Sequence, residues 1–249
     1  MTAAEDSTAL LEDARERLIV ALDVPEATAA LSLAEALAPT VGYFKVGLEL
    51  FGAAGPGFVR ELVARQARVF LDLKLHDIPA TVGRSVAVLG RLGVSLVTVH
   101  AAGGAEMMRQ AALAAAAADS PPGVLAVTAL TSLDAADLRA VGISLSPAAL
   151  VLQRARLAAD CGVAGVVSSV REAGAVRAAV AEGFHIVTPG IRPAGAAACD
   201  QKRVGTPAGA IAAGASHLVV GRPIRDAPDP VRAARDLVAE MATALGTLS

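Results

Sequence analysis

The segment LDLKLHDIPATV, residues 71–82, places Asp72, Lys74 and Asp77 at the end of an apolar run. Read with the period of two of a β-strand, Asp72 and Lys74 share one face of the strand, whereas the leucines share the other. The preceding residues are equally apolar, so the pattern predicts a strand that is buried on both faces. Charged groups in such a place are costly unless they are paired, and perturbed charges cluster at functional sites. The pattern therefore favours a chemical role for these three side chains.

Lysine is rare in this chain, so its positions are informative. Of 22 basic residues only three are lysines, namely Lys45, Lys74 and Lys202. Arginine stays protonated at physiological pH, whereas the pKa of a lysine can be shifted, so that a lysine can deliver a proton. Lys74 is therefore a candidate proton donor. On composition alone, chance remains an alternative explanation for three positions.

Eight short apolar runs alternate with amphipathic helical stretches along the chain. The runs cover 18–23, 43–47, 69–74, 96–100, 124–128, 165–169, 185–190 and 217–222. Buried strands that alternate with helices are typical of a parallel sheet, and eight such units in about 250 residues match a (β/α)8, or TIM, barrel. We therefore expect a single barrel domain over 1–249 with a helical extension at 1–17. A doubly wound open α/β sheet is the competing fold.

Polar side chains fall at the carboxyl-terminal ends of these strands. They are Asp23, Lys45, Asp72, Lys74, His100, Ser168 and Arg222. In a barrel these ends meet at one mouth, where the active sites of this fold are built. Some strand-end Asp and Ser residues cap the next helix instead, but lysines cannot act as N-caps. The distribution predicts a catalytic site at the mouth, whereas His185 and His217 begin their strands and are expected at the opposite end.

Two loops that combine glycine with arginine follow the last two strands, in TPGIRPAG (188–195) and GRPIRDAPDP (221–230). The corresponding loops of such barrels commonly bind phosphate, because glycine lets backbone N–H groups approach an anion and arginine adds charge-assisted hydrogen bonds. A glycine that only turns the chain, next to an arginine that is only solvated, would explain one such loop. It is a poor explanation for the same combination in both loops. The candidate phosphate ligands are Gly190, Arg192, Gly221, Arg222 and, on the segment between the two strands, Gln201.

Composition excludes several classes of protein. Hydrophobic residues make up 54% of the chain and charged residues 18%, which predicts a large core and little disorder. A net charge of −2 without a basic tract gives no surface for nucleic acid. The acidic start does not match a signal peptide, and the longest apolar run is too short to span a membrane, so we expect a cytoplasmic protein. Cys161 and Cys199 lack metal-ligand spacing and are expected to be unpaired thiols.

These stretches together resemble the orotidine 5′-phosphate decarboxylase family. LDLKLHDIPATV is similar to the family signature Asp-x-Lys-x-x-Asp-Ile-Pro, and the stretches ALD, FKVG, VH, LTS, TPGIRP, DQKRV and GRPI occur in the family's order. The signature alone is less specific, because sugar-phosphate decarboxylases and synthases of the same superfamily carry it too. The resemblance implies a barrel enzyme that converts orotidine 5′-phosphate to UMP and CO2, the last step of pyrimidine nucleotide synthesis, without a cofactor or a metal.

The resemblance also implies roles for individual residues. Lys74 would donate a proton to C6 of the pyrimidine, Asp72 would stand beside the departing carboxylate, and Lys45 would extend a line of alternating charge. Asp77 would reach into the neighbouring subunit of a homodimer. The implied substrate contacts are Asp23, Lys45, Ile78, Thr81, Thr131, Pro189, Gly190, Arg192, Gln201, Gly221 and Arg222.

Several alternatives stay open from the residues alone. Asp77 could cap the helix that begins near Pro79, with Thr81 as a rival cap. His100 could orient its neighbours rather than transfer a proton. A magnesium-dependent decarboxylase of a keto-sugar phosphate is one competing function, against which Lys45 and the TPGIRP and DQKRV stretches argue. A non-catalytic nucleotide-binding barrel is another, although a protein that only binds gains nothing from crowding like charges.

Overall fold

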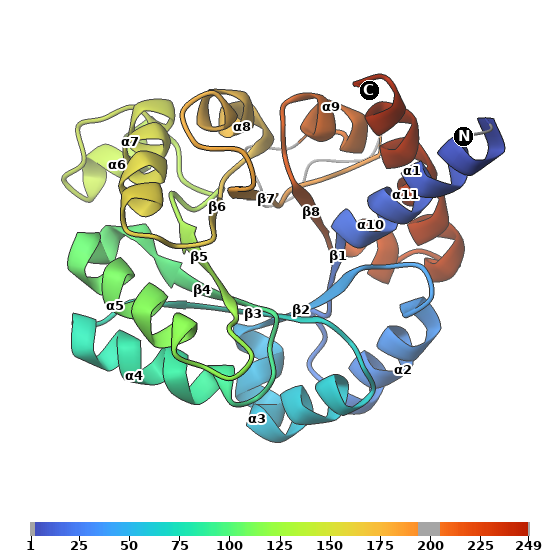
Figure 1. The fold of residues 1–249 in the computed structure, drawn as a ribbon, viewed down its shortest axis with the longest axis horizontal. Coiled ribbons are helices and arrows are strands. Elements are labelled where there is room, and N and C mark those ends of the chain that lie inside the picture. Colours follow the sequence, from blue (N-terminus) through green and yellow to red (C-terminus); the bar gives the residue numbers. More distant parts are fainter. Residues whose placement is uncertain (1–2, 194–204, 249) are drawn as a thin grey trace.

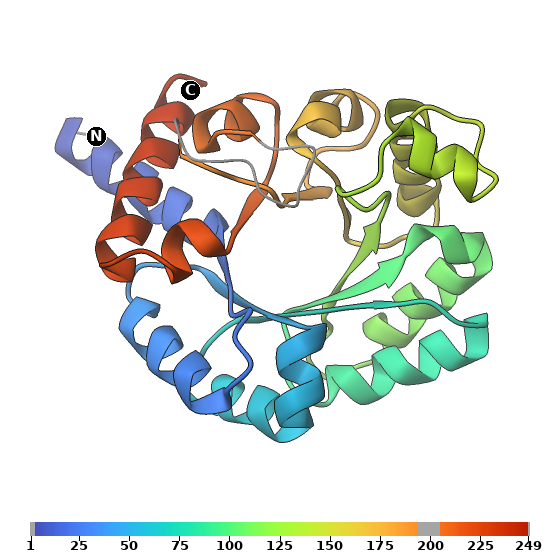
Figure 2. The ribbon, with the colours of Figure 1, turned by 180° about the vertical axis from the view of Figure 1, so that it is seen from behind.

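The structure is a computed structural model that describes residues 3–193 and 205–248. Its eight strands are parallel and follow one another around a closed barrel, in which β1 pairs with both β2 and β8. Helices surround this ring of strands, which is drawn from two opposite sides in Figures 1 and 2. The predicted (β/α)8 barrel is therefore confirmed. The competing open sheet is excluded, because an open sheet would leave β1 and β8 unpaired.

The strands are β1 (Leu18–Ala21), β2 (Tyr43–Gly47), β3 (Val69–Leu75), β4 (Leu96–His100), β5 (Gly123–Val127), β6 (Gly165–Val167), β7 (His185–Thr188) and β8 (His217–Val220). β1, β6, β7 and β8 each end two residues before the predicted limit. The residues after β6, β7 and β8 are polar, glycine or proline, whereas β1 is followed by the buried Leu22 and then Asp23, and all of them lie in the loops at the mouth of the barrel.

The α-helices are α1 (Ala3–Arg17), α2 (Ala27–Leu37), α3 (Leu48–Ala64), α4 (Pro79–Gly90), α5 (Gly104–Ala116), α6 (Ala135–Ala140), α7 (Pro147–Asp160), α8 (Val170–Arg177), α9 (Pro207–Ala212), α10 (Arg222–Arg225) and α11 (Pro230–Gly246), and a short 3-10 helix, η1 (Ala101–Gly103), precedes α5. The helical extension predicted before the first strand is α1. Over residues 3–193 and 205–248, none of the helices has both the length and the apolar character needed to cross a bilayer.

Apolar side chains form two separate clusters, one inside the barrel and one between the strands and the helices. The side chains of a strand alternate between these clusters, so that Ile19 and Ala21 of β1 face inward while Leu18 and Val20 face the helices. Bulky residues such as Phe70 and Leu125 fill the inner cluster. The barrel interior is therefore a packed core, which leaves room for a cavity only at its mouth.

Aromatic rings and one arginine occupy the amino-terminal end of the barrel. The ring of His217 lies edge-on to those of Tyr43 and His185, with centroid distances of 5.6 and 5.1 Å. The guanidinium carbon of Arg68 stands 4.3 Å from the centroid of the Tyr43 ring, a cation–π geometry. Both histidines therefore lie at the end of the barrel away from the mouth, as we expected from their positions at the starts of their strands.

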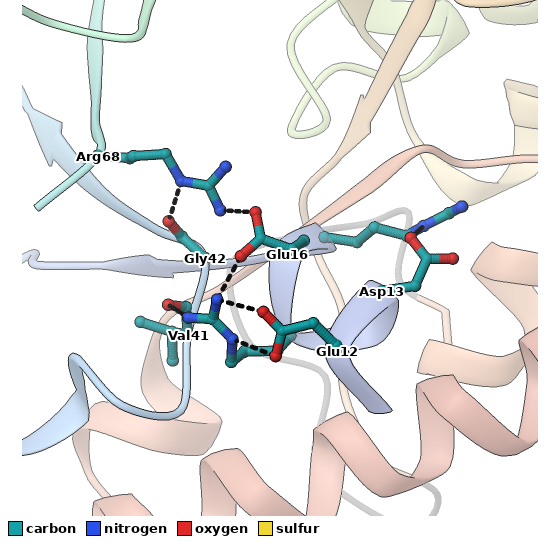
Figure 3. Close-up of polar contacts among 8 residues, drawn as sticks. Glu12, Asp13, Glu16, Val41, Gly42 and Arg68 are labelled. Carbon is teal, nitrogen blue, oxygen red and sulfur yellow. Dashed lines mark hydrogen bonds and ion pairs between the residues drawn. The ribbon is translucent and has the colours of Figure 1, made fainter. Parts of the chain in front are cut away.

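Helix α1 is fixed to this end of the barrel by a cluster of charged side chains (Figure 3). Glu16 accepts hydrogen bonds from both Arg15 and Arg68. Arg68 also donates to the carbonyl of Gly42 at 3.0 Å, and Arg15 donates to the carbonyl of Val41 at 3.4 Å. Helix α1 packs against α11 as well, so the extension joins the two ends of the chain.

Burial of His217 makes the stability of this end of the barrel dependent on pH. Desolvation, and after it the nearby charges of His185, Arg17 and Arg68, lower the pKa of His217 to about 3, while Asp13 opposes this shift. In the unfolded chain the pKa is about 6.5, so between these two values the unfolded state binds more protons than the folded state. Stability is therefore fully present above about pH 6.5 and falls as the pH decreases, by at most ~1.4 kcal/mol per pH unit for this proton.

We predict that His217→Phe makes the free energy of unfolding less dependent on pH. Urea unfolding monitored by circular dichroism between about pH 7 and about pH 4.5 measures this dependence. Leu113, which is 64% exposed on α5, gives a control, since Leu113→Phe changes no titratable group and should leave the wild-type slope unchanged. Equal slopes for wild type and His217→Phe would contradict the prediction.

Candidate active site

A cavity of about 470 Å³ opens at the carboxyl-terminal ends of the strands. Its size lies within the range of roughly 300–1,000 Å³ that is typical of small-molecule sites. One side of the cavity carries four charged residues, which follow or end β1, β2 and β3. The glycine–arginine loops that follow β7 and β8 line the part of the cavity on the other side of β1 from β2. The mouth thus has one end suited to charge-dependent chemistry and another suited to binding an anion.

Asp23, Lys45, Asp72 and Lys74 form a line of alternating charge, here called the charge line. Lys45 Nζ lies 2.8 Å from Asp23 Oδ1 and 3.9 Å from Asp72 Oδ2. Lys74 Nζ donates to the same Asp72 Oδ2 at 2.9 Å. Only 10% of the Lys45 side chain and 14% of the Asp72 side chain are exposed, so these charges depend on one another for stabilisation.

A glycine at the end of β2 makes room for the charge line. A Cβ atom at Gly47 would lie 2.9 Å from Lys45 Nζ and 3.2 Å from Asp23 Oδ1. Both distances are shorter than ordinary van der Waals contacts, so a larger residue would push the ion pair apart. Sequence reasoning read the FKVG stretch only for its lysine and missed this glycine.

The backbone of β3 is irregular where it carries Asp72 and Lys74. Leu71 pairs with Val97 and Leu75 with Val99 of β4, with a shift of register between the two pairs. Lys74 has a φ of 51°, in the left-handed region that residues with a side chain rarely adopt. Both charged side chains line the cavity as predicted: Asp72 continues the alternation from the inward-facing Phe70 in regular register with β2, whereas Lys74 lies within the irregular part of the strand.

The prediction that this strand is buried on both faces was correct only for its first half. Val69, Phe70 and Leu71 are buried, whereas residues 72–75 are partly exposed. The end of the strand borders the cavity on one face. On the other face Leu73 and Leu75 line a second groove, together with Thr81 and Val88.

Apolar side chains form the wall of the cavity beside the charge line. They are Phe70, near the start of β3, and Val127, Val167 and Val219, which end or nearly end their strands. An apolar wall lowers the local dielectric constant and therefore strengthens the interaction between a charge and a ligand bound beside it. Thr131 and Leu130, on the loop after β5, border the same space. The sequence analysis identified Thr131 but missed the apolar wall. The wall could have been found from the inward-facing position that each of its residues has in its strand.

The end of the cavity suited to an anion is lined by Pro189, Gly190 and Arg192 after β7 and by Gly221 and Arg222 after β8. Gly190 has a φ of 80°, a conformation that favours glycine. The loop is held to the rest of the barrel by a hydrogen bond of 2.9 Å from the Arg192 backbone N–H to the Gly205 carbonyl. The loop therefore has a defined shape. Gln201, the remaining predicted phosphate contact, lies outside the described residues.

Arg225 is a cavity residue that sequence reasoning missed. Its Nη1 donates to the backbone carbonyl of Asp23 at 2.6 Å, and its Nε pairs with Asp226 at 2.6 Å. The bond to Asp23 ties the loop after β1 to α10, which follows β8. Arg225 could have been identified from the sequence, because it lies three residues after Arg222, about one helical turn away on the same side of the helix.

Asp77, Ile78 and Thr81 do not line the cavity of their own chain. Asp77 is exposed, and its Oδ1 accepts a hydrogen bond of 2.6 Å from the Ile78 N–H. Ile78 is 66% exposed and is itself the residue that caps α4, without a side-chain hydrogen bond. The two alternatives in which Asp77 or Thr81 caps this helix were therefore wrong.

Two of the strand-end residues, His100 and Ser168, lie at the carboxyl ends of their strands but do not line the cavity. His100 Nδ1 accepts the Ala102 N–H at 3.1 Å, and its ring stacks on His76 with 5.3 Å between centroids. Burial is the main cause that lowers the pKa of His100 to about 4, so this ring is neutral at pH 7. Ser168 is buried behind the wall because the inward position in β6 belongs to Val167.

The carboxylate at the centre of the cavity is poorly placed to bind a divalent metal. Asp72 Oδ2 faces two ammonium groups, and Oδ1 accepts a hydrogen bond of 3.0 Å from Thr98. A cation bound there would be repelled by both lysines at close range. In the part of the chain that the structure describes, no group of three or more His, Cys, Asp or Glu residues is arranged to hold a metal ion.

Fold and site together define a (β/α)8 barrel protein with a charged cavity and two glycine–arginine loops at its mouth. The family model described as Orotidine 5'-phosphate decarboxylase / HUMPS family matches residues 16–237. The chain therefore belongs to the orotidine 5′-phosphate decarboxylase / HUMPS family, which confirms the resemblance seen in the sequence.

Individual relatives agree with this assignment. An orotidine 5′-phosphate decarboxylase of Anaeromyxobacter sp. (strain K) is 55% identical over 226 residues, which are 90% of this chain and 97% of the relative. One from Moorella thermoacetica is 53% identical over 234 residues, 92% of this chain and 93% of the relative. A solved structure of orotidine 5′-phosphate decarboxylase from Lactobacillus acidophilus matches with a TM-score of 0.81 and 37% identity, over 90% of this chain and 98% of that one.

We predict that Arg222→Ala weakens the binding of inorganic phosphate about 10- to 100-fold, because a charge-assisted hydrogen bond contributes ~1.5–3 kcal/mol. Isothermal titration calorimetry measures the affinity. Arg232→Ala removes the same charge from an exposed position on α11 and serves as the control. If both variants bind phosphate equally well, Arg222 is not a phosphate ligand.

Proposed function

We propose that this protein decarboxylates orotidine 5′-phosphate to UMP and CO2 without a metal ion or an organic cofactor. The observation that carries the proposal is the charge line, which ends on Lys74 beside the apolar wall of the cavity. The named activity of the relatives supports the choice of substrate.

The proposed reaction needs one proton donor and no oxidant or reductant. The bond between C6 of the pyrimidine and the carboxylate breaks, and its electron pair remains on C6 while CO2 leaves. The Lys74 ammonium stabilises this developing carbanion and then transfers a proton from Nζ to C6, which forms the C6–H bond of UMP. The neutral amine regains its proton from water. Asp72 stands beside the departing carboxylate and holds the ammonium in place through the 2.9 Å contact.

One ion pair cannot supply the whole rate enhancement. The uncatalysed reaction is very slow, so the protein must lower the barrier by on the order of 20 kcal/mol. Two unit charges ~4 Å apart interact by only ~4 kcal/mol at an effective dielectric constant of 20. The remainder comes from a pre-organised site and from binding energy at parts of the substrate far from C6.

The two ends of the cavity suit the two ends of this substrate. In the proposal Arg192, Arg222 and the backbone at Gly190 and Gly221 bind the 5′-phosphate, with Pro189 beside them and Gln201 closing over the group. Asp23 and Lys45 bind ribose hydroxyls, and Thr131 contacts the pyrimidine ring. Arg225 then has a positioning role, because it joins the loop that bears Asp23 to the helix that begins at Arg222.

We further propose that the protein is a homodimer in which Asp77 completes the site of the partner subunit. Asp77 is exposed beside Ile78, which is 66% exposed, and Val88 on α4 is 51% exposed. The groove between β3 and α4, which includes Thr81, extends this partly apolar surface. A second copy of the chain would cover the apolar side chains and would bring Ile78 and Thr81 near a bound substrate.

A magnesium-dependent decarboxylase of a keto-sugar phosphate is the nearest competing function. It would use Asp72 as a metal ligand, although that carboxylate already faces two ammonium groups. Loss of orotidine 5′-phosphate absorbance in a protein treated with EDTA separates the two functions, and such turnover also excludes a barrel that only binds nucleotides.

We predict that Lys74→Ala abolishes UMP formation, with a loss of at least about 10⁴-fold in kcat, because both the cation and the proton are removed. Absorbance measures turnover, and calorimetry with UMP verifies that the variant still binds the product. Lys74→Arg keeps the charge but cannot readily release a proton, so it should also turn over poorly. Normal turnover by Lys74→Ala would refute the assignment of this residue.

We predict that mixing Lys74→Ala with Asp77→Ala restores activity, although each variant alone is inactive. A mixed dimer contains one site with both defects and one site with neither, so random exchange of subunits gives about a quarter of the wild-type activity. Turnover is measured after the two variants have been incubated together. If the mixture stays inactive while size-exclusion chromatography of differently tagged chains detects mixed dimers, Asp77 acts within its own chain.

A further inference from the structure

A single residue of β4 stands opposite the bulge that carries the proposed catalytic pair. Between the pairs Leu71↔Val97 and Leu75↔Val99, β3 contains residues 72–74, whereas β4 contains only Thr98. The regular ladder of backbone hydrogen bonds cannot continue through such a mismatch. The backbone of Lys74 therefore needs another partner there.

Thr98 supplies that partner. The backbone N–H of Lys74 donates to Thr98 Oγ1 at 2.8 Å. Lys74 has a φ of 51°, and an unfavourable backbone conformation of this kind persists only where its surroundings fix it. The hydroxyl replaces a backbone carbonyl as the acceptor, and in this way it fixes the point from which the Lys74 side chain departs.

The same hydroxyl orients Asp72. Thr98 Oγ1 donates to Asp72 Oδ1 at 3.0 Å, which leaves Oδ2 to face the ammonium groups of Lys74 and Lys45. A carboxylate can only accept a hydrogen bond and a backbone N–H can only donate one, so both roles of the hydroxyl are determined. One oxygen atom thus holds both members of the pair.

Thr98 lies outside the cavity. It is fully buried and does not line the cavity, so it has no route to contact the substrate. The residues that end β5 and β6 on the inward side, Val127 and Val167, are apolar. A buried hydroxyl costs free energy in such surroundings unless it is hydrogen-bonded, and both of its hydrogen bonds go to β3.

We infer that Thr98 is a positioning residue for the decarboxylation, because its hydroxyl fixes the Lys74 backbone and the Asp72 carboxylate in one arrangement. This inference rests on the function proposed for Lys74. The bulge thereby orients the Lys74 ammonium toward C6, and β4 contributes to catalysis although it does not contact the substrate.

Thr98→Val tests the inference, because valine keeps the shape of threonine and removes only the hydroxyl. We expect kcat to fall about 100-fold, as for a misplacement of a catalytic group by about 1 Å, while the affinity for UMP changes less than about threefold. Thr98→Ser retains the hydroxyl and should recover most of kcat. Thr188→Val is the matched control, since Thr188 of β7 is also buried and its Oγ1 has no hydrogen-bond partner among the described residues.

Unchanged kcat in Thr98→Val, or an equal loss of kcat in Thr98→Val and Thr188→Val, would overturn the inference. If the valine variant does not fold, Thr98→Cys replaces it, because a thiol is only a weak hydrogen-bonding group. The cysteine variant should likewise lose kcat while it still binds UMP.

A crystal structure of Thr98→Val gives a readout that does not depend on activity. We expect Lys74 to leave the left-handed region and its Nζ to move away from Asp72 Oδ2, beyond the present 2.9 Å. An unchanged arrangement would overturn the inference. If the wild-type protein does not turn over orotidine 5′-phosphate, the proposed function fails, and this structure still decides whether Thr98 holds the pair.

Discussion

The Asp72 carboxylate shares one oxygen atom between the ammonium groups of Lys45 and Lys74, and the arrangement of the mouth depends on this contact. Without the carboxylate, two like charges would face each other in a largely buried space. The closed barrel makes the contact possible, because the ends of three neighbouring parallel strands lie at the same level. Ala21 pairs with Lys45 and Gly47 with Asp72, and this register brings the charges into one line.

A site of this kind requires a rigid scaffold. Burying ion pairs does not by itself stabilise a fold, since the loss of hydration offsets most of the attraction. The packed interior and the larger cluster between strands and helices supply the apolar burial that the charge line does not. The same rigidity allows a left-handed lysine and a bulged strand to persist beside the cavity. Local backbone strain and a stable barrel are thus two parts of one arrangement.

Much of this could be predicted from the sequence, because strand and helix periods and strand-end polarity are local signals. They gave the eight-fold alternation and placed Asp72, Lys74 and the glycine–arginine loops at the mouth. The bulge could not be predicted, since counting residues with a period of two assumes that the strand is regular. Thr98 was missed for the same reason, because its role appears only when β3 and β4 are aligned. The role proposed for Asp77 could not be derived from the residues alone, because it involves a second chain, to which no local pattern refers.

The contact between α1 and α11 has a consequence for synthesis of the protein. Helix α1 is synthesised before its acceptor at Val41 and its partner Arg68, which follow it closely in the sequence. Its second partner, α11, and β8, which closes the ring against β1, are synthesised much later. The nascent chain therefore carries an unsealed sheet edge and an uncovered helix face until β8 and α11 have been synthesised. In this interval the protein is most exposed to aggregation.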